Sequence, residues 1–225
     1  RTFGLFAGLG IASALVIEMT IIPVVRSDGA GASAQFTKYM IDQTPDIYCP
    51  FIRSKLKLSG SSCPSVSFYP AFGNSKAQVG SNGVANYVSA SYGAGAIGYV
   101  EYAYAKQNKM NHVQLRNQAG SFVAPDDLTF KAAAAGADWA KTFAQDLTDK
   151  PGKDSWPITG ATYIIMYKLA DKPEASSTAL KFFEWAYQNG DKSAEDLEFV
   201  PLPASVKDLV RKQWASQIKD SAGKS

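Results

Sequence analysis

A strand that leads through a small-residue turn into a helix constrains the fold of this chain more than any other feature. Ile21 to Val25 is a run rich in β-branched residues, which favours a strand. The run stops at Arg26-Ser27-Asp28-Gly29-Ala30-Gly31-Ala32-Ser33, where glycines and other small residues predict a turn. Beyond the turn, the spacing of Phe36, Met40 and Ile41 predicts a helix. This order of elements indicates an α/β fold.

Strands and helices are expected to alternate along the rest of the chain as well, which is typical of the α/β class. Thr44 to Ser75 is the exception, because four prolines and little periodicity predict an ordered loop there. Asp149 to Asp154 combines charge, proline and glycine, so we expect a linker. The expected elements are strands over Gly93 to Tyr99, Val113 to Leu115 and Ala161 to Leu169, and helices from Gly80, over Tyr99 to Gln107, from Pro125 to Phe143, over Ser176 to Gln188, around Ala194 to Leu197 and from Ala204 to Lys219.

The charge distribution argues against a nucleic-acid partner. Lys and Arg number 23 against 20 Asp and Glu, and the net charge of +3 is spread along the chain rather than gathered in a basic tail. Proteins that bind nucleic acid concentrate positive charge on one face or stripe. With 46% hydrophobic residues, the chain has the ordinary composition of a packed soluble protein.

The two cysteines, Cys49 and Cys63, stand in the proline-containing segment that we expect to be a loop. A disulfide between them would stabilise the fold by about 3 kcal/mol and would imply an oxidising compartment. A pair of free thiols is the alternative. No metal site is expected, because zinc takes four ligands and the chain has one histidine, His112, and no second cysteine pair.

Residues 1–20 carry an apolar run, Phe3 to Ile17, which follows Arg1. The run is short for a bilayer span, which takes about 20 residues. A positive residue before such a run is typical of a secretory signal or an anchor. A buried helix or strand of a domain is the competing interpretation, and both stay open.

The turn from Arg26 to Ser33 is the best candidate for a binding site. Glycines let backbone N–H groups converge at the start of a helix, where unpaired donors and about half a positive charge suit an oxyanion. Arg26 adds a planar cation that can grip two oxygens, and Asp28 is placed to orient it. Such a turn is also compatible with a purely structural role, and it lacks the Gly-Lys-Ser/Thr ending of a Walker loop.

The sequence does not indicate an enzyme. A serine or cysteine nucleophile would need His112 as its base, and this histidine stands in a polar turn that we expect at the surface. The carboxylate pairs Asp126-Asp127 and Glu195-Asp196 stand near expected helix starts, where capping explains them. Aromatic residues such as Phe182 and Trp185 have helical spacing, so we expect them to pack in a core rather than to stack on bases or sugars.

Two stretches, Val24 to Thr37 and Gly95 to Gln107, carry most of the resemblance of this chain to a known family, the periplasmic phosphate-binding proteins of bacterial ABC-type phosphate importers. Val24 to Thr37 resembles the phosphate-gripping loop of that family, and Gly95 to Gln107 resembles its most recognisable segment. The resemblance covers about residues 22 to 220. Further stretches follow in the family's order at Gly136 to Leu147, Trp156 to Thr159 and Lys181 to Tyr187.

The resemblance implies an α/β solute-binding fold of two lobes with strands that cross between them. Residues 21–150 would form an anion-binding lobe, and residues 151–225 would return to the other lobe. The opening portion of that other lobe has no match in this chain, so the resemblance implies a partial copy in which one lobe is incomplete. Residues 1–20 would be an unmatched apolar leader or remnant.

The resemblance also implies a site for inorganic phosphate. Arg26 would form the charged contact, and Asp28 would orient it. The family usually has hydroxyl residues at two positions that are alanine here, so weaker or altered binding follows, with Ser33 available to replace one of them. The N–H groups implied to bind phosphate oxygens are those of Ala30, Gly31 and Ala32.

The expected function is therefore that of an extracytoplasmic solute-binding protein that hands phosphate to an ABC transporter permease, without a cofactor. We expect a monomer in the periplasm or outside the cell, free or anchored to the membrane. The alternative is a secreted remnant or interaction protein with the same fold and with weakened or lost anion binding. An enzyme built on the same loop, such as a phosphatase, has the least support, because the sequence offers neither a nucleophile with its base nor a metal cluster.

Overall fold

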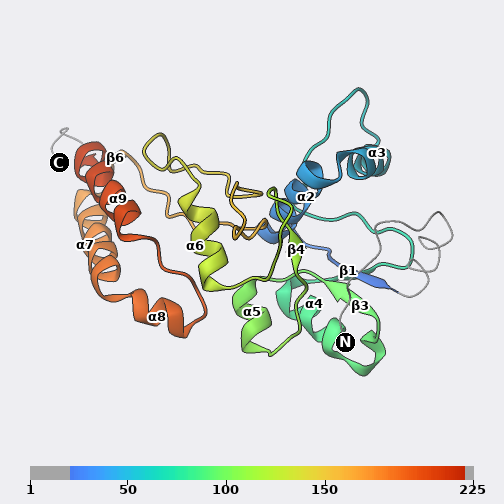
Figure 1. Ribbon diagram of the computed structural model, residues 1–225. Coiled ribbons are helices and arrows are strands. Elements are labelled where there is room, and N and C mark those ends of the chain that lie inside the picture. Colours follow the sequence, from blue (N-terminus) through green and yellow to red (C-terminus); the bar gives the residue numbers. More distant parts are fainter. Residues whose placement is uncertain (1–20, 221–225) are drawn as a thin grey trace. The chain divides into compact units, whose positions relative to one another are not determined.

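The computed structural model describes residues 21–220, and Figure 1 shows its ribbon. The chain divides into two compact units between Met110 and Asn111. The apolar leader or remnant expected at residues 1–20 lies outside the described residues. The assignment of residues 21–150 and 151–225 to two lobes stays a prediction.

The first unit is built on a parallel sheet in which β1 (Ile22–Arg26) lies between β2 (Lys76–Gln78) and β3 (Ala96–Gly98). The last three residues of β1 are buried, as expected for the central strand of a parallel sheet. Because the strands are parallel, their carboxyl ends meet at one edge of the sheet. Arg26 is the residue of β1 at that edge.

Helices follow each strand of this sheet, as the sequence predicted for β1 and β3, whereas the strand β2 was not predicted. Helix α4 packs closely on β3, because a Cβ at Gly98 would lie 2.6 Å from Val84 Cγ1. A larger residue at this position would therefore push α4 away from the sheet. The helices of the first unit are α2 (Gly31–Gln43), α3 (Pro45–Leu56), α4 (Gly80–Ser89) and α5 (Tyr102–Gln107), with a short 3-10 turn at Ser91–Gly93.

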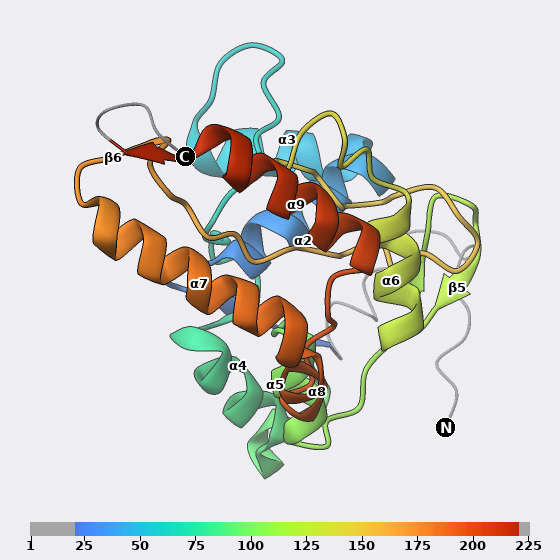
Figure 2. The ribbon, with the colours of Figure 1, turned by 90° about the vertical axis from the view of Figure 1, so that its left-hand side faces the viewer.

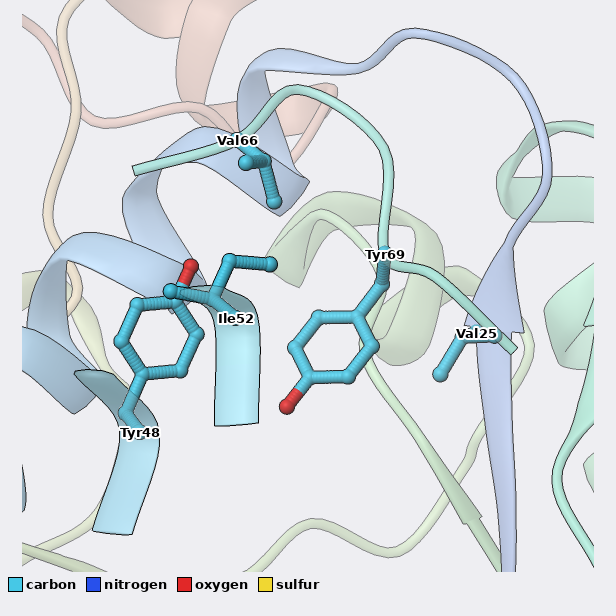
Figure 3. Packing of buried hydrophobic residues seen from close by; sticks show 5 residues of the cluster. All are labelled: Val25, Tyr48, Ile52, Val66 and Tyr69. Atoms are coloured by element: carbon cyan, nitrogen blue, oxygen red, sulfur yellow. The ribbon is translucent and has the colours of Figure 1, made fainter. Parts of the chain in front are cut away.

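Five buried side chains form the core of the first unit: Val25, Tyr48, Ile52, Val66 and Tyr69. Figure 3 shows them converging from β1, from α3 and from the segment that follows α3. Tyr48 and Ile52 are completely buried and stand one helical turn apart, so they share one face of α3. The core thus lies between the central strand and a helix.

The ordered loop expected over residues 44–75 is wrong in its first part, which is the helix α3. Pro45 stands in the first turn of this helix, where its missing N–H costs nothing. Burial of Tyr48 and Ile52 stabilises the helix although Pro50 lies in its interior. The number of prolines therefore mispredicts this segment, because their positions and the tertiary packing decide the outcome.

The rest of that segment is a loop without regular structure, which several contacts hold in place. A disulfide joins Cys49 on α3 to Cys63 in the loop, so the bridged alternative is the one found in the structure. Tyr48 OH donates to the Pro64 carbonyl at 3.1 Å. The Val66 N–H donates to Thr37 Oγ1 of α2 at 3.0 Å. The loop is thereby fixed against both helices.

The second unit opens with the antiparallel pair β4 (Leu115–Arg116) and β5 (Phe122–Val123), followed by α6 (Asp127–Ala135). A capping box starts this helix. The Thr129 N–H donates to Asp126 Oδ1 at 2.8 Å, and the Asp126 N–H donates to Thr129 Oγ1 at 3.0 Å. These bonds confirm the helix start and the capping role predicted for Asp126.

The alanine-rich helix α6 is shorter than predicted, because it ends at Ala135 and not at Phe143. Trp139 folds back onto its last turn, where the indole Nε1–H donates to the Ala134 carbonyl at 2.8 Å. The Trp139 ring is buried in the core of the second unit. Packing of one large ring thus overrides the helix propensity of the alanines.

The long helices α7 (Pro173–Asn189) and α9 (Ala204–Gln217) lie side by side in the second unit, as Figures 1 and 2 both show. Arg211 Nε donates to the Glu184 carboxylate at 2.9 Å, and the rings of Tyr187 and Trp214 stack with centroids 5.5 Å apart.

No helix within residues 21–220 is long and apolar enough to cross a membrane. The remaining elements are α8 (Asp191–Asp196) and the parallel pair of β6 (Leu169–Ala170) and β7 (Lys219–Asp220).

The strand predicted over Ala161 to Leu169 is wrong for most of its length, because only Leu169 and Ala170 form a strand. No described strand pairs with residues 161–168, and Ile165 is 94% exposed. The core packing predicted for Phe182 and Trp185 is also wrong, since both side chains are more than half exposed. Apolar spacing can predict a strand or the apolar face of a helix. The side chains on that face are buried only where another element packs against them.

The pair Glu195-Asp196 is not at a helix start, as was predicted, but in the last turn of α8. Asp196 accepts from Lys192 Nζ at 2.7 Å, one helical turn earlier. An exposed pair at this spacing explains the carboxylate without a capping role.

The linker predicted at Asp149 to Asp154 lacks helix and strand, yet it is an ordered turn. Asn117 is 1% exposed and lies inside this turn. Its Nδ2 is 3.1, 2.9 and 3.1 Å from the carbonyls of Gly152, Lys153 and Ser155. A crossing between lobes at this point stays a prediction.

Candidate anion-binding site

The guanidinium of Arg26 has a partner at each of its three nitrogens. Asp28 contacts two of them, with Nε donating to Oδ1 at 2.8 Å and Nη2 donating to Oδ2 at 2.5 Å. The remaining nitrogen, Nη1, donates to Ser81 Oγ at 3.3 Å. The Arg26 side chain is only 8% exposed. The cation is therefore held in one orientation at the carboxyl edge of the sheet.

The ion pair keeps both of its groups charged around neutral pH. The hydrogen bond from Arg26 and a second one from the Gly80 N–H hold the pKa of Asp28 well below its ordinary value. The hydrogen bond to Asp28 also raises the pKa of Arg26, although burial opposes this effect. Asp28 thus serves to orient a permanently charged guanidinium.

The N-terminus of α2 supplies backbone donors shortly after Arg26. Its N-cap, Ala30, has an extended backbone, no side chain caps the helix, and the first turn holds no acidic residue. The first N–H groups of a helix find no acceptor within it and carry the positive end of the helix dipole. Since the Ala30 N–H donates to the Ser67 carbonyl at 2.7 Å, the N–H groups of Gly31 and Ala32 are the better candidates for anion contacts.

A second helix N-terminus at the same edge is already neutralised by Asp28. Helix α4 begins at Gly80, and the Gly80 N–H donates to Asp28 Oδ1 at 3.0 Å. Gly80 has a φ of 68°, a left-handed conformation that glycine adopts readily. Asp28 therefore joins Arg26 to α4, whereas α2 receives no carboxylate of its own in the first turn.

Comparison with protein families matches residues 14–189 to the PBP superfamily domain. The chain belongs to this superfamily. The matched range contains Arg26, Asp28 and the whole of α2, and the α/β class predicted from the sequence agrees with it. The geometry at the end of β1 is thus a feature of a PBP superfamily member.

Curated relatives of this PBP superfamily chain are named phosphate-binding protein PstS. It is 39% identical over 202 residues to the protein of Haemophilus influenzae, which covers 88% of this chain and 56% of that relative. It is 38% identical over 210 residues to the protein of Pasteurella multocida, with 92% of this chain and 56% of that relative covered. For Xylella fastidiosa the identity is 37% over 198 residues, 87% of this chain and 50% of the relative. The chain spans about half the length of these relatives.

The names of these relatives describe binding proteins and not enzymes, in agreement with the prediction from the sequence. His112 is exposed and lies in a segment without helix or strand. This placement agrees with the surface histidine that was predicted. Among residues 21–220, no three His, Cys, Asp or Glu side chains gather in a group suited to a metal ion.

The structure brings together some of the predicted site residues and not others. Arg26 and Asp28 are paired as predicted. Ser33 is fully buried, and its Oγ lies 2.8 Å from Tyr99 OH. The hydroxyl of Ser33 is therefore engaged with Tyr99, so it is poorly placed to replace the hydroxyls absent at Ala30 and Ala32. The phosphate contacts of all these residues stay predictions.

Three residues of the site were not identified from the sequence: Ser81, Tyr99 and Glu101. Tyr99 OH accepts from the Arg26 N–H at 3.3 Å, and its ring stacks on Phe36 with centroids 4.8 Å apart. Ser81 Oγ donates to the Glu101 carboxylate. All three residues lie within three positions of the end of a strand of the parallel sheet, and polar residues shortly after such strands are the signal that could have pointed to them.

Proposed function

We propose that this chain is the anion-binding part of an extracytoplasmic solute-binding protein for inorganic phosphate. The observation that carries the proposal is the placement of Arg26, which Asp28 fixes at the end of the central strand, shortly before the first turn of α2. A fixed cation and unpaired helix N–H groups together suit a small oxyanion. The names of the relatives support phosphate as that anion.

Arg26 has the donors that such a site needs. A guanidinium carries five N–H groups, and the contacts to Asp28 and Ser81 use three of them. The other two belong one to each terminal nitrogen, and N–H groups of a guanidinium can bind two oxygens of one tetrahedral anion. Hydrogen bonds of this kind bind an anion without any covalent step, so the proposed function is binding.

We further propose that the bound phosphate is delivered to an ABC transporter permease, and that the protein works in the periplasm or outside the cell. The disulfide between Cys49 and Cys63 supports an oxidising compartment. We expect a monomer, and the dispersed net charge of +3 gives no reason to expect a nucleic-acid partner.

The test is calorimetric titration of the purified chain with sodium phosphate, with sodium chloride at the same ionic strength as the control. Saturable heat with phosphate alone is the expected result. A folded protein that gives no heat at millimolar phosphate contradicts the proposal. Sulfate titrated under the same conditions then measures selectivity.

A second candidate function is a remnant or interaction protein with weakened anion binding. The small number of free donors near the start of α2 favours this candidate. Ala30 and Ala32 lack side-chain hydroxyls, and the Ala30 N–H donates to the Ser67 carbonyl. Each lost hydrogen bond to a charged group costs about 1.5 to 3 kcal/mol, which is about a tenfold to a hundredfold loss of affinity. Binding only above millimolar phosphate, in a protein with an intact fold, would support this candidate.

A further inference from the structure

We propose that Ser81 and Glu101 form a positioning pair that fixes the direction of the Arg26 guanidinium. Ser81 contacts Nη1 of Arg26 and donates its own proton to Glu101. The predicted effect of the pair on anion affinity rests on the proposed phosphate-binding function. Its effect on the guanidinium itself does not, and this difference allows the two ideas to be tested separately.

Asp28 and Ser81 contact different nitrogens of the Arg26 guanidinium. Asp28 contacts Nε and Nη2 and leaves Nη1 untouched. Ser81 Oγ lies 3.3 Å from that remaining nitrogen. The guanidinium is planar, so its N–H groups lie in one plane. With both partners present, rotation about the Cζ–Nη1 bond breaks the hydrogen bond to Ser81, which therefore slows this rotation and holds this end of the group in place. Without Ser81, Nη1 loses this restraint.

The hydroxyl proton of Ser81 points toward Glu101. A hydroxyl has one proton to donate and two lone pairs that accept. Because Glu101 takes the proton, the lone pairs of Ser81 are available to the N–H of Arg26. If Glu101 did not accept the proton, the hydroxyl would be free to rotate and to turn its proton toward the cation. Glu101 therefore makes Ser81 an acceptor.

The parallel sheet places Ser81 and Glu101 near Arg26. Ser81 is the second residue of α4, which follows β2, and Glu101 directly precedes α5, which follows β3. In the parallel register Arg26 is paired with Gln78 of β2, and Val24 is paired with Gly98 of β3. The three side chains thus come from the ends of three neighbouring strands. Their meeting is a consequence of the register.

Neither residue of the pair is needed for the core, which makes the proposal accessible to mutation. Ser81 is partly exposed and Glu101 is exposed. The negative charge of Glu101 also opposes an incoming anion, so its removal has two opposite effects on affinity. Ser81→Ala removes the contact to Arg26 without changing any charge, and it is therefore the decisive variant.

The first arm of the test is nuclear magnetic resonance of the arginine side chains in the protein without phosphate. We expect the Nη1 group of Arg26 to rotate several-fold faster in Ser81→Ala and in Glu101→Ala than in the wild type. Ser89→Ala, at the exposed far end of the same helix, should leave the rotation unchanged. Equal rotation rates in the wild type and in Ser81→Ala would overturn the proposal, whatever the protein binds.

The second arm is the dissociation constant for phosphate, measured by calorimetry for the same variants. Ser81→Ala is expected to weaken phosphate binding about tenfold, whereas Ser89→Ala is expected to have no effect. In an Arg26→Lys background the effect of Ser81→Ala should largely disappear, because a positioning residue acts through the guanidinium. An equal loss in both backgrounds would make Ser81 a direct ligand and would contradict the positioning role. If the wild type binds no phosphate, the proposed function fails while the first arm still decides this inference.

Discussion

The hydroxyl groups of Ser33 and Tyr99 lie 2.8 Å apart and join the first turn of α2 to the residue that follows β3. The Tyr99 hydroxyl also accepts the backbone N–H of Arg26, and its ring stacks on Phe36 of α2. One side chain therefore connects the two parts of the candidate site, the end of β1 and the start of α2. Loss of the Tyr99 hydroxyl should therefore disturb both the end of β1 and the start of α2.

Tyr99→Phe tests this connection, because it removes the hydroxyl and keeps the ring that stacks on Phe36. The buried hydroxyl of Ser33 then loses its partner, so we expect the free energy of unfolding to fall by about 1 to 3 kcal/mol. Urea denaturation measures this value. Tyr92→Phe, in which an exposed tyrosine loses the same atom, is the control and should change it little. Equal stabilities of Tyr99→Phe and the wild type would contradict the connection.

The parts of the site that are close in sequence could be predicted from it. The β-branched run, the small-residue turn and the helix follow one another, so Arg26 and Asp28 can be placed from local patterns alone. Ser81, Tyr99 and Glu101 depend on which strands are neighbours and in what register. The sequence of a three-residue strand such as β2 carries too little periodicity to determine either.

Tertiary packing explains the errors in the predicted fold. Two side chains buried on one face favour the helix α3 over the loop that its prolines predict. A single buried ring, that of Trp139, ends α6 early. Residues 161–168 show the reverse case, because their composition predicts a strand and no described strand pairs with them.

The disulfide between Cys49 and Cys63 should contribute much of the stability of the first unit. It closes a loop with a sequence separation of 14. The loss of chain entropy in the unfolded state predicts about 3 kcal/mol of stabilisation. We expect reduction with dithiothreitol to lower the urea midpoint accordingly. A Cys49→Ser, Cys63→Ser double variant should match the reduced protein and should not respond to reductant. A wild type that ignores reductant at unchanged midpoint would contradict this prediction.

The Arg26–Asp28 pair predicts how stability depends on pH. The pKa of Asp28 in the folded protein is held below its ordinary value by Arg26 and by the Gly80 N–H. A lowered pKa stabilises the fold above the ordinary value of about 4, and this contribution is lost as the pH falls below it. The stability difference between the wild type and Asp28→Asn should therefore be constant from pH 8 to pH 5 and should shrink toward pH 3.

Denaturation curves at each pH measure that difference, with Asp154→Asn of the second unit as a control for the loss of an exposed carboxylate. A difference between the wild type and Asp28→Asn that stays the same down to pH 3 would show that the pair does not stabilise the fold.

Restoring hydroxyls at the start of α2 should strengthen phosphate binding. The family that the sequence resembles usually has hydroxyl residues where this chain has Ala30 and Ala32. We expect an Ala30→Ser, Ala32→Thr double variant to bind phosphate at least tenfold more tightly, because one new hydrogen bond to a charged group is worth about 1.5 to 3 kcal/mol. Ala34→Ser, one turn further along α2, is the control. Unchanged affinity would mean that the anion does not approach this turn.

Arg26 should be the most important side chain for any anion that this protein binds. Arg26→Ala removes the cation and leaves the carboxylate of Asp28 beside the incoming anion, so attraction is replaced by repulsion. We expect phosphate binding to be lost in this variant. Arg26→Lys should recover only part of it, because an ammonium group cannot form the planar two-point contact of a guanidinium.

Calorimetry and thermal melting of the same proteins separate a binding role of Arg26 from a structural one. Arg53→Ala is the charge-matched control, because Arg53 belongs to α3 and its guanidinium makes one long contact to the Gly60 carbonyl. In a binding role, Arg26→Ala loses affinity far beyond any change in melting temperature, and Arg53→Ala keeps both. A variant Arg26→Ala that melts earlier but binds phosphate as tightly as the wild type would reduce the turn to a scaffold. The anion site would then have to lie elsewhere in the chain.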